Sequence, residues 1–372
     1  MSILPTQFQR SQVLAALDRR VQQATGAVLR SRFVASACAP HDVDDYVRVI
    51  HPFWSVRQVV ARVLEVRHEG SQAVALRLRP NANWAGHLPG QYVGFTVPIA
   101  GVHLRRCFTI ASAPHEDDLL VAIRRRAGAL VGEWAATQAQ QGQLVTLSQA
   151  LGDFVLPDPV PPRLLFVCGG IGVTPIRAFL RHLLDNGLGG RLACMYFTGQ
   201  VGAFDEELAG LAAEHERFDY VSIPPGQAAL DLPLLQKLVP DFLDCPAFVC
   251  GPERLERAAA ELFPQERFHT ERFVDAGRFD GQLAGDANRC TLTFAQSGKQ
   301  TETTGAQNLL EAAERAGLHP AHGCRMGICR TCTCRKRSGV VRNLQTGECS
   351  AEGEEEIRLC VSAPCTDVTL EL

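Results

Sequence analysis

The sequence has little that would take it outside the ordinary class of soluble globular proteins. Of its 372 residues, 7% are aromatic, 21% are charged and 46% are hydrophobic, which excludes a disordered, collagenous or coiled-coil chain. The net charge of −3, from 37 basic and 40 acidic residues, excludes bulk electrostatic binding to nucleic acid. The longest stretch without a charge, residues 80–104, contains three prolines and four glycines. It is therefore predicted to form strands and turns and not a membrane span.

Targeting and hydrolase motifs are missing as well. The first residues lack a basic start followed by an apolar core, which argues against a secretory signal, so we expect a cytoplasmic protein. The sequence shows no internal repeat, no nucleophile elbow and no metalloprotease motif. These absences exclude the commonest hydrolytic sites.

Cysteine, in contrast, is abundant and unevenly placed. The chain has 14 cysteines, and half of them fall within the last 50 residues. These seven are Cys324, Cys329, Cys332, Cys334, Cys349, Cys360 and Cys365. Because disulfides are rare in a reducing cytosol, clustered thiols of this kind indicate a metal centre.

Residues 1–52 are predicted to be a separate N-terminal helical extension. Apolar residues recur within residues 1–35 at spacings of three and four, which predicts one face of a helix. These positions are Leu14, Leu17, Val21, Ala24 and Val28. The segment holds five Arg and one Asp. A basic helix lying on a membrane surface or a partner, and a helix packed on its own protein, both fit this pattern.

Three domains are predicted to follow this extension. Short β-rich runs separated by turns over residues 53–157 predict an antiparallel β-barrel. The proline-rich segment 157–162 cannot continue a helix or a central strand, so it marks a boundary. Over residues 160–274 strands and helices alternate, which predicts a doubly wound α/β domain with a parallel sheet. Residues 286–372 are predicted to form an α+β domain that contains the cysteine cluster.

The cysteine cluster has a diagnostic spacing. Cys324, Cys329 and Cys332 form C-x4-C-x2-C, and Cys360 follows after 27 residues. This is the plant-type spacing in which four thiolates hold a [2Fe-2S] cluster. A structural zinc site is the alternative, but zinc sites usually use two C-x2-C-like pairs and only one strict pair is present. Cys334 is excluded as a ligand by the spacing alone.

A glycine turn lies between a predicted strand and a predicted helix. It consists of Gly169, Gly170, Ile171, Gly172, Val173, Thr174 and Pro175. Glycines let backbone N–H groups approach a diphosphate, and the following helix N-terminus favours its negative charge. Pro175 suits the first turn of a helix, and Thr174 is a candidate to cap it or to contact phosphate. A strict G-x-G-x-x-G is absent.

These motifs resemble two known families. The sequences HGCRMGICRTCTC (residues 322–334) and RLCVSAP (residues 358–364) make the last 85 or so residues similar to a plant-type ferredoxin, which has a β-grasp fold. The GGIGVTP turn, together with Cys250-Gly251-Pro252 before Glu253, resembles the NAD(P)H domain of the ferredoxin–NADP reductase superfamily. The resemblance implies that the Cys250 turn lies beside the nicotinamide.

The same resemblance implies a flavin motif of the form R-x-Y/F-S/T on the preceding barrel. Arg106, Cys107, Phe108 and Thr109 match it. Arginine supplies a fixed fork for a flavin phosphate, the aromatic face covers the ring system, and the hydroxyl hydrogen-bonds near its reactive nitrogen. Arg105 is the alternative if the register is shifted by one.

A second flavin element is expected at a glycine-containing turn that starts a helix. Gly128, Ala129 and Leu130 occupy that turn, and Gly132 stands where the family usually has a hydroxyl. We expect FAD, with FMN as the alternative. The domain order resembles the phthalate dioxygenase reductase type, which uses FMN. The N-terminal extension and residues 101–106 resemble FAD-type reductases that serve fatty-acyl desaturases.

NADH is predicted over NADPH as the co-substrate. A 2′-phosphate would need Lys or Arg after the second strand of the α/β domain, and none stands between Arg191 and Arg217. Thr109 and Cys250 are predicted to position the hydride transfer. Two charged segments, 335–337 and 352–356, are candidates to orient a docking protein or to be ordinary solvated faces.

The predicted function is that of an NAD(P)H-dependent iron–sulfur flavoprotein reductase. Electrons would pass from reduced nicotinamide through the flavin and the [2Fe-2S] cluster to an acceptor protein. The expected acceptor is a di-iron fatty-acyl desaturase; a ring-hydroxylating dioxygenase or another monooxygenase is the alternative. A redox sensor without turnover is a third interpretation, from a different class of protein.

Overall fold

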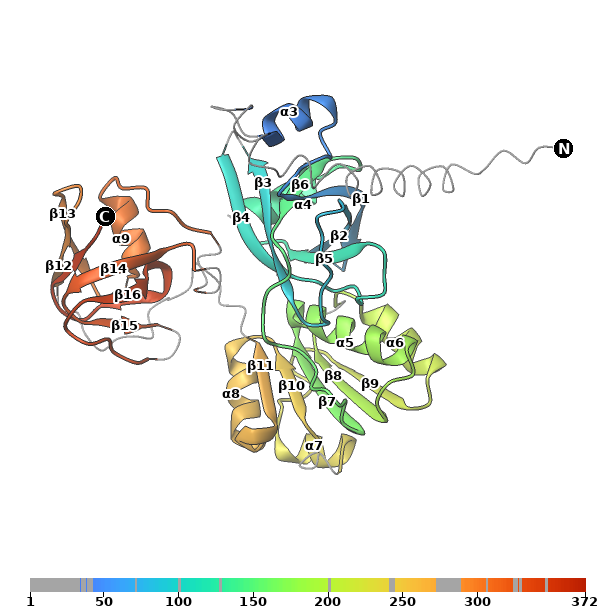
Figure 1. Ribbon diagram of the computed structural model, residues 1–372. Coiled ribbons are helices and arrows are strands. Elements are labelled where there is room, and N and C mark those ends of the chain that lie inside the picture. The colour runs from blue at the N-terminus through green and yellow to red at the C-terminus, as the bar shows by residue number, and fades with distance from the viewer. Residues whose placement is uncertain are drawn as a thin grey trace. The chain divides into compact units, whose positions relative to one another are not determined.

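The computed structural model describes most of the chain from residue 43 onward. The described ranges are 43–70, 72–99, 102–126, 129–199, 202–240, 245–271, 289–305, 307–323, 330–344 and 347–372, together with Val34, Cys38 and Gly327. The helix expected within residues 1–35 falls, apart from Val34, outside the described residues. The chain divides into two compact units: one contains the two N-terminal sheets apart from Leu104–Cys107, and the other contains the C-terminal sheet together with Leu104–Cys107 (Figure 1).

The first sheet has six strands in the order β4-β3-β6-β1-β2-β5. Their bounds are Val59–Glu69 (β1), Ala73–Pro80 (β2), Tyr92–Ile99 (β3), Val102–Thr109 (β4), Leu119–Arg124 (β5) and Leu144–Leu147 (β6). Strands β1, β2, β5 and β6 pair antiparallel, and so do β3 and β6. Helix α4 (Leu130–Thr137) lies in sequence between β5 and β6. The prediction of an antiparallel flavin-type domain is thus confirmed.

A short helix, α3 (Val43–Ile50), precedes this sheet and lies within the predicted N-terminal helical extension, beyond the apolar period found in residues 1–35. Its buried Asp44 accepts hydrogen bonds from the Ser55 hydroxyl (2.7 Å) and the Val56 amide (2.5 Å). These bonds fasten the helix to the start of the sheet. Val49 and Ile50 at its end are exposed. Eight residues are too few for an apolar period to stand out from the sequence.

The second sheet is parallel, with the order β11-β10-β7-β8-β9. Its strands are Arg163–Gly169 (β7), Arg191–Phe197 (β8), Phe218–Ile223 (β9), Ala247–Cys250 (β10) and Phe268–Glu271 (β11). The helices are Val173–Asp185 (α5), Asp205–Glu214 (α6), Leu232–Leu238 (α7) and Glu253–Leu262 (α8). The predicted α/β alternation is confirmed. Strand β11 was not predicted because it is only four residues long and includes His and Glu.

Alternating residues of this sheet face different helices, as the period of a strand requires. Leu165 belongs to a buried cluster with Leu235 of α7 and Leu255 of α8. Its neighbour Phe166 stacks on Phe179 of α5, with ring centroids 5.8 Å apart. The sheet is therefore covered on both faces, and its strands read as continuous apolar runs.

The first two sheets are joined by a packed interface inside one compact unit. Phe154, which follows β6, lies 5.4 Å from Phe179 and 5.7 Å from Phe248 of β10, measured between ring centroids. A Cβ at Gly90 would stand 2.0 Å from the Phe154 carbonyl oxygen. Gly90, with φ +89°, is thus required both by its conformation and by the close approach.

The C-terminal unit contains a mixed five-stranded sheet in the order β13-β12-β18-β14-β16. Its strands are Arg289–Phe294 (β12), Gln300–Thr304 (β13), Thr333–Ser338 (β14), Glu355–Arg358 (β16) and Val368–Leu370 (β18). A second pair joins β15 (Val341–Asn343) to β17 (Ser362–Pro364). Helix α9 (Leu309–Arg315) begins at Asn308, whose side chain accepts a hydrogen bond from the Glu311 amide. The α+β prediction is confirmed.

Candidate functional site

Strand β4 carries the predicted flavin motif at its C-terminal end. Thr109 is buried, and its Oγ1 has no hydrogen-bond partner among the described residues. The same holds for Nε of Arg105. Arg106 donates from Nη1 to the Arg105 carbonyl (2.8 Å). Buried polar atoms without partners are costly, so two such atoms on one strand mark a place where a polar ligand fits.

Phe108, the aromatic residue of the motif, packs against a neighbouring aromatic side chain. The Phe108 ring meets Phe95 of β3 edge-on, with centroids 5.7 Å apart and planes at 74°. Phe95 in turn packs on Trp134 of α4. Cys107, between the two predicted contact residues, is buried. The ring of Phe108 is therefore fixed in orientation by the sheet.

The second predicted flavin element is described only in part. Gly128 lies outside the described residues. Ala129 is the N-cap of α4 and Leu130, the first residue of the helix, is exposed. Gly132, where a hydroxyl was expected, stands close to β5: a Cβ there would lie 2.7 Å from the Arg124 carbonyl oxygen. Close packing of α4 on β5 explains why this position is glycine.

The predicted nucleotide residues gather at the carboxyl end of β7. They are Gly169, Gly170, Gly172, Val173, Thr174 and Pro175, and they pass through a short 3-10 turn into α5. Gly170 has φ +54°, and its carbonyl accepts a hydrogen bond from the Tyr196 hydroxyl (3.0 Å). The Thr174 hydroxyl donates to the Ile171 carbonyl (2.9 Å), so it stabilises the turn itself.

This glycine turn packs directly against the Cys250 turn. A Cβ at Gly172 would stand 2.2 Å from the Cys250 carbonyl oxygen, and one at Gly169 would stand 2.7 Å from Cδ of Pro252. A Cβ at Gly251 would be 3.0 Å from the Gly169 nitrogen. The two turns can approach this closely only because these positions are glycine. The structure thus brings together the two nucleotide motifs that the sequence placed about 80 residues apart.

Cys250 is the last residue of β10 and is fully buried. It pairs in register with Cys168 on one side and with Glu271 on the other. Burial raises the pKa of the Cys250 thiol well above its usual value, and Glu271 and Glu256 raise it further. The thiol is therefore protonated at neutral pH, which suits a positioning role and excludes a thiolate nucleophile.

Glu271 is not among the predicted site residues and lies at the same end of the sheet. Desolvation and the charge of Glu256 raise the pKa of Glu271 to about 8. Its Oε2 is buried and has no hydrogen-bond partner among the described residues. Glu271 could not be found from the sequence, because it is a single carboxylate in a polar segment. Only its pairing in register with Cys250 shows that it is buried at the end of the sheet.

Of the four predicted cluster ligands, the two that the structure describes lie next to each other. Cys324 and Cys329 lie outside the described residues. The Sγ atoms of Cys332 and Cys360 are 3.2 Å apart, and the Gly327 amide donates to Sγ of Cys360 at 3.2 Å. Two buried thiols with a backbone N–H aimed at one of them fit the ligand chemistry of an iron–sulfur cluster.

Cys334 points to different partners. Its Sγ donates to the carbonyl oxygens of Arg335 (3.6 Å) and Glu371 (3.7 Å). Among the described residues no group of three or more His, Cys, Asp or Glu side chains is placed to hold a metal ion, since two of the four predicted ligands are not described. The exclusion of Cys334 stays a prediction that these contacts support.

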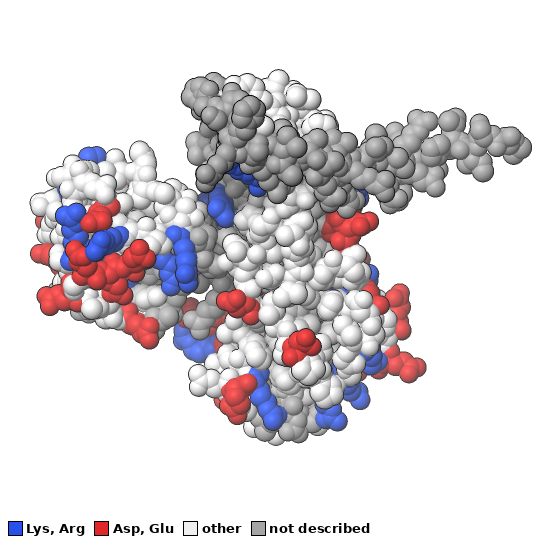
Figure 2. Space-filling model, in the orientation of Figure 1, with Lys and Arg blue, Asp and Glu red and all other residues white. Residues whose placement is uncertain are grey.

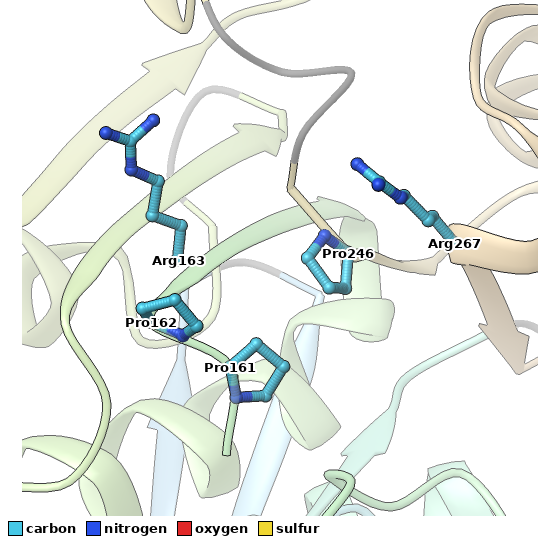
Figure 3. Close-up of a pocket in the computed structure, with 5 residues that line it drawn as sticks. All are labelled: Pro161, Pro162, Arg163, Pro246 and Arg267. Carbon is cyan, nitrogen blue, oxygen red and sulfur yellow. The ribbon is translucent and has the colours of Figure 1, made fainter. Parts of the chain in front are cut away.

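A separate pocket of about 420 Å³ lies at the opposite end of the parallel sheet. Figure 3 shows Arg163 and Arg267 flanking Pro161, Pro162 and Pro246, at the edge where β7, β10 and β11 begin. None of the predicted site residues lines it. Because nucleotides bind at the carboxyl ends of parallel strands, we do not assign the nicotinamide to this pocket.

Comparison with known proteins agrees with this arrangement. The model of the oxidoreductase NAD-binding domain matches residues 166–261, and that of the 2Fe-2S iron-sulfur cluster binding domain matches residues 292–365. An NADPH oxidoreductase of Mycobacterium tuberculosis is 31% identical over 353 residues, which cover 92% of this chain and 91% of that protein. The stachydrine N-demethylase reductase subunit of Rhizobium meliloti is 26% identical, covering 86% of this chain and 98% of that protein.

Among solved structures, phthalate dioxygenase reductase matches with a TM-score of 0.59 and 20% identity, covering 85% of this chain and 98% of that chain. The chain belongs to the ferredoxin–NADP reductase superfamily, in the branch of NAD(P)H-dependent flavoprotein oxidoreductases with a 2Fe-2S ferredoxin domain. Its cofactors are a flavin and a [2Fe-2S] cluster, and its co-substrate is a reduced nicotinamide. Among the described residues no helix is long and apolar enough to cross a bilayer.

Proposed function

We propose that this chain is the reductase component of an oxygenase system, which delivers single electrons to an oxygenase protein. The observation that carries the proposal is the presence, in one polypeptide, of candidate sites for a flavin, a nicotinamide and an iron–sulfur cluster. These are the buried hydroxyl of Thr109, which has no hydrogen-bond partner in the described part of the chain, the glycine turn packed on Cys250, and the thiol pair of Cys332 and Cys360. Together these sites can hold every electron carrier needed between a reduced nicotinamide and a one-electron acceptor.

Each part of the chain has a role in this proposal. Arg106 and the turn at Ala129 hold the flavin phosphate, and Phe108 and Thr109 contact its ring system. A flavin accepts a hydride and releases electrons one at a time, which is the chemistry that links nicotinamide to a cluster. The backbone of the glycine turn binds the nucleotide diphosphate, while Cys250 and its following glycine leave room for the nicotinamide.

The remaining predicted residues complete two of these sites. Cys107, Gly128 and Leu130 are proposed to line the flavin site. Cys324 and Cys329 are proposed to join the described thiol pair as the other two cluster ligands. Four thiolates satisfy the coordination of a [2Fe-2S] cluster without any other side chain.

The relatives favour an oxygenase acceptor over the fatty-acyl desaturase expected from the sequence. The Rhizobium meliloti relative is the reductase subunit of a demethylase, and a relative in Pseudomonas aeruginosa, 27% identical, is a glycine betaine monooxygenase reductase subunit. The chain covers 98% and 86% of these proteins, so the likeness extends across their whole domain order.

NADH stays the proposed co-substrate. Asp205, at the start of α6, already accepts hydrogen bonds from the hydroxyls of Tyr220 (2.6 Å) and Ser222 (3.2 Å). The basic residues that flank the segment are engaged elsewhere, with Arg191 paired to Asp219 and Arg217 bound to three carbonyls. The Mycobacterium tuberculosis relative has NADPH in its name, so both nucleotides belong in the test.

Anaerobic titration of the purified protein tests the internal chain. NADH is expected to bleach the flavin and the iron–sulfur absorption bands, and chromatography of the extracted flavin is expected to give FAD. Bleaching by NADPH alone would overturn the nucleotide assignment, and bleaching by neither would favour the redox sensor.

The acceptor is tested by mixing the pre-reduced protein with an oxygenase component or with a membrane di-iron desaturase. Reoxidation is followed in a stopped-flow spectrometer, with cytochrome c as a nonspecific acceptor for comparison. Faster reoxidation by the oxygenase than by the desaturase supports the proposal. The reverse order would restore the desaturase assignment.

A further inference from the structure

Arg177 is a buried cation at the interface of the first two sheets. It lies on α5, and 8% of its side chain is exposed. Its guanidinium forms a two-pronged contact with Glu207, in which Nε donates to Oε2 (2.8 Å) and Nη2 donates to Oε1 (2.7 Å). Nη1 donates to the Ala111 carbonyl at 2.6 Å. Glu116 lies 3.8 Å from the same nitrogen.

Arg177 and its two hydrogen-bond partners connect three segments of the chain. Ala111 lies two residues beyond Thr109, the last residue of the proposed flavin strand. Arg177 itself follows Pro175 by two residues, so it is rigidly connected to the glycine turn. Glu207 is in the first turn of α6, directly after the loop that follows β8.

A second contact strengthens the attachment of that loop. Phe204 precedes α6 with φ 60°, a conformation that is rare for a bulky side chain. The Arg177 guanidinium carbon lies 5.1 Å from the Phe204 ring centroid, and the Phe204 amide donates to Glu69 of β1 at 3.1 Å. The loop is thus held to the first sheet by two routes, one through its backbone and one through Arg177.

We propose that Arg177 is a positioning residue for hydride transfer. By tying the Ala111 carbonyl to α5 and α6, it sets the separation between the strand that carries Thr109 and the turn that packs on Cys250. This inference rests on the proposed roles of those two residues. Because hydride transfer requires the donor and acceptor atoms at near-contact distance, a displacement of about 1 Å is enough to cost on the order of a hundredfold in rate.

Lysine cannot replace this side chain. Its ammonium is a point donor without the planar fork that bonds Glu207 through two atoms and Ala111 through a third. The Arg177→Lys variant therefore keeps the buried charge while it loses the geometry. Arg181, one turn further along α5, pairs with Asp185 of its own helix at 3.2 Å. The Arg181→Lys variant is the matched control, because its ion pair lies within α5 and lysine leaves in place the contact between Asp185 and His115 (3.1 Å).

The test compares the wild-type holoenzyme with these two variants by anaerobic stopped-flow reduction of the flavin over a range of NADH concentrations. Arg177→Lys is expected to lower the limiting reduction rate by about tenfold to a hundredfold while the NADH Kd changes less than about threefold. Arg181→Lys is expected to change neither value appreciably. Flavin content, measured first, shows that the compared samples are equally loaded.

A readout independent of turnover separates positioning from general destabilisation. Hydrogen–deuterium exchange of the flavin-free proteins is expected to be faster in Arg177→Lys within residues 110–113 and 202–210, with melting temperature still well above the assay temperature. An unchanged limiting rate, or an equal loss in Arg181→Lys, would overturn the inference. Failure of the wild type to reduce its flavin would instead overturn the proposed function.

Discussion

Two buried cations, one in each compact unit, show how differently the two units are held together. Arg177 bonds to Glu207 and to the Ala111 carbonyl, which lie 30 and 66 positions away in the sequence. Lys336 is fully buried, and its Nζ donates to the carbonyls of Gly339 (2.8 Å), Ala351 (2.7 Å) and Gly353 (2.6 Å), only 3 to 17 positions away.

The contrast follows from what each unit has to fix. The flavin–nicotinamide unit must set the geometry between two separate sheets, so its cation bridges distant segments through a directional fork. The C-terminal unit must close the segment between β14 and β16, so a point charge that binds three nearby carbonyls is sufficient. Loss of the first cation should alter a rate, whereas loss of the second should alter local folding and cluster retention.

Removal of one thiol of the pair should produce the largest effect, and only in the C-terminal unit. Cys332→Ser is expected to abolish the iron–sulfur absorption and electron transfer to cytochrome c. Reduction of a two-electron dye such as dichlorophenolindophenol by NADH should persist, because the flavin lies upstream of the cluster. Both signals are measured on the same purified sample by visible spectroscopy.

Cys334→Ser is the matched control for that experiment. Serine can also donate to the Glu371 carbonyl, which Sγ of Cys334 contacts, so the cluster should be retained. Loss of the cluster in Cys334→Ser, with retention in Cys332→Ser, would reverse the ligand assignment. Loss of dye reduction in Cys332→Ser would show that the two units do not function separately.

Lys336→Met should destabilise the C-terminal unit strongly while leaving flavin reduction intact. Methionine fills a similar volume, but three carbonyls lose a buried charged donor, at a cost of about 3 kcal/mol or more. For a unit of this size that corresponds to a fall in melting temperature of roughly 10 °C or more, measured by circular dichroism of the holoprotein. Early loss of the iron–sulfur absorbance on heating should report the same event.

Lys299→Met provides the comparison within the same unit. Lys299 is exposed and donates to the carbonyls of Ala316 (3.1 Å) and Gly317 (3.2 Å) at the end of α9. Its removal leaves these carbonyls accessible to water, so the change should stay below about 1 kcal/mol. Equal effects of the two substitutions would contradict the distinction between buried and exposed lysines.

The same contrast explains what the sequence could predict. The glycine turn, the R-C-F-T motif and the cysteine spacing are read from neighbouring residues, because the chemistry needs several groups from one short segment. Arg177 gave no such signal, since its partners are far away in the chain. Neither of the two interpretations of residues 335–337, a docking face or a solvated face, holds for Lys336, because strand alternation turns it inward with Cys334.

The charged side chains that remain outside are mixed and not segregated. Figure 2 shows acidic and basic residues side by side on the visible face of the C-terminal unit. Arg335 pairs with Glu354 at 2.5 Å, and Arg337 pairs with Glu371 at 3.0 Å. The sequence runs of like charge are thus partly neutralised by pairing across strands, which a linear sequence does not show.

Thr109→Val should produce a smaller effect, with opposite signs in the flavin-free and flavin-bound protein. The Oγ1 atom is buried and unpartnered among the described residues, so replacing the hydroxyl by a methyl group should stabilise the flavin-free protein by about 1 kcal/mol. Flavin affinity should fall by about tenfold, equivalent to about 1.4 kcal/mol. Melting curves and fluorescence titration with flavin measure the two quantities, and Thr109→Ser should restore affinity. A fall in the stability of the flavin-free Thr109→Val protein would show that the hydroxyl has a partner without flavin, and would contradict its assignment as a flavin contact.

The stability of the flavin–nicotinamide unit should also depend on pH. Burial lowers the pKa values of His87 and His182 in the folded protein. The two histidines therefore cost no stability above pH 6.5, and they lower the free energy of unfolding as the pH drops from 6.5 towards their pKa values in the folded protein. Glu271 acts in the opposite direction: its pKa is raised from 4.5 to about 8, so its contribution is lost as the pH rises from 4.5 through 8. Melting temperatures measured between pH 5 and 9 should therefore pass through a maximum. Glu271→Gln should abolish the fall in melting temperature at alkaline pH and leave the fall at acid pH. If the alkaline fall persists in this variant, another group is responsible for it.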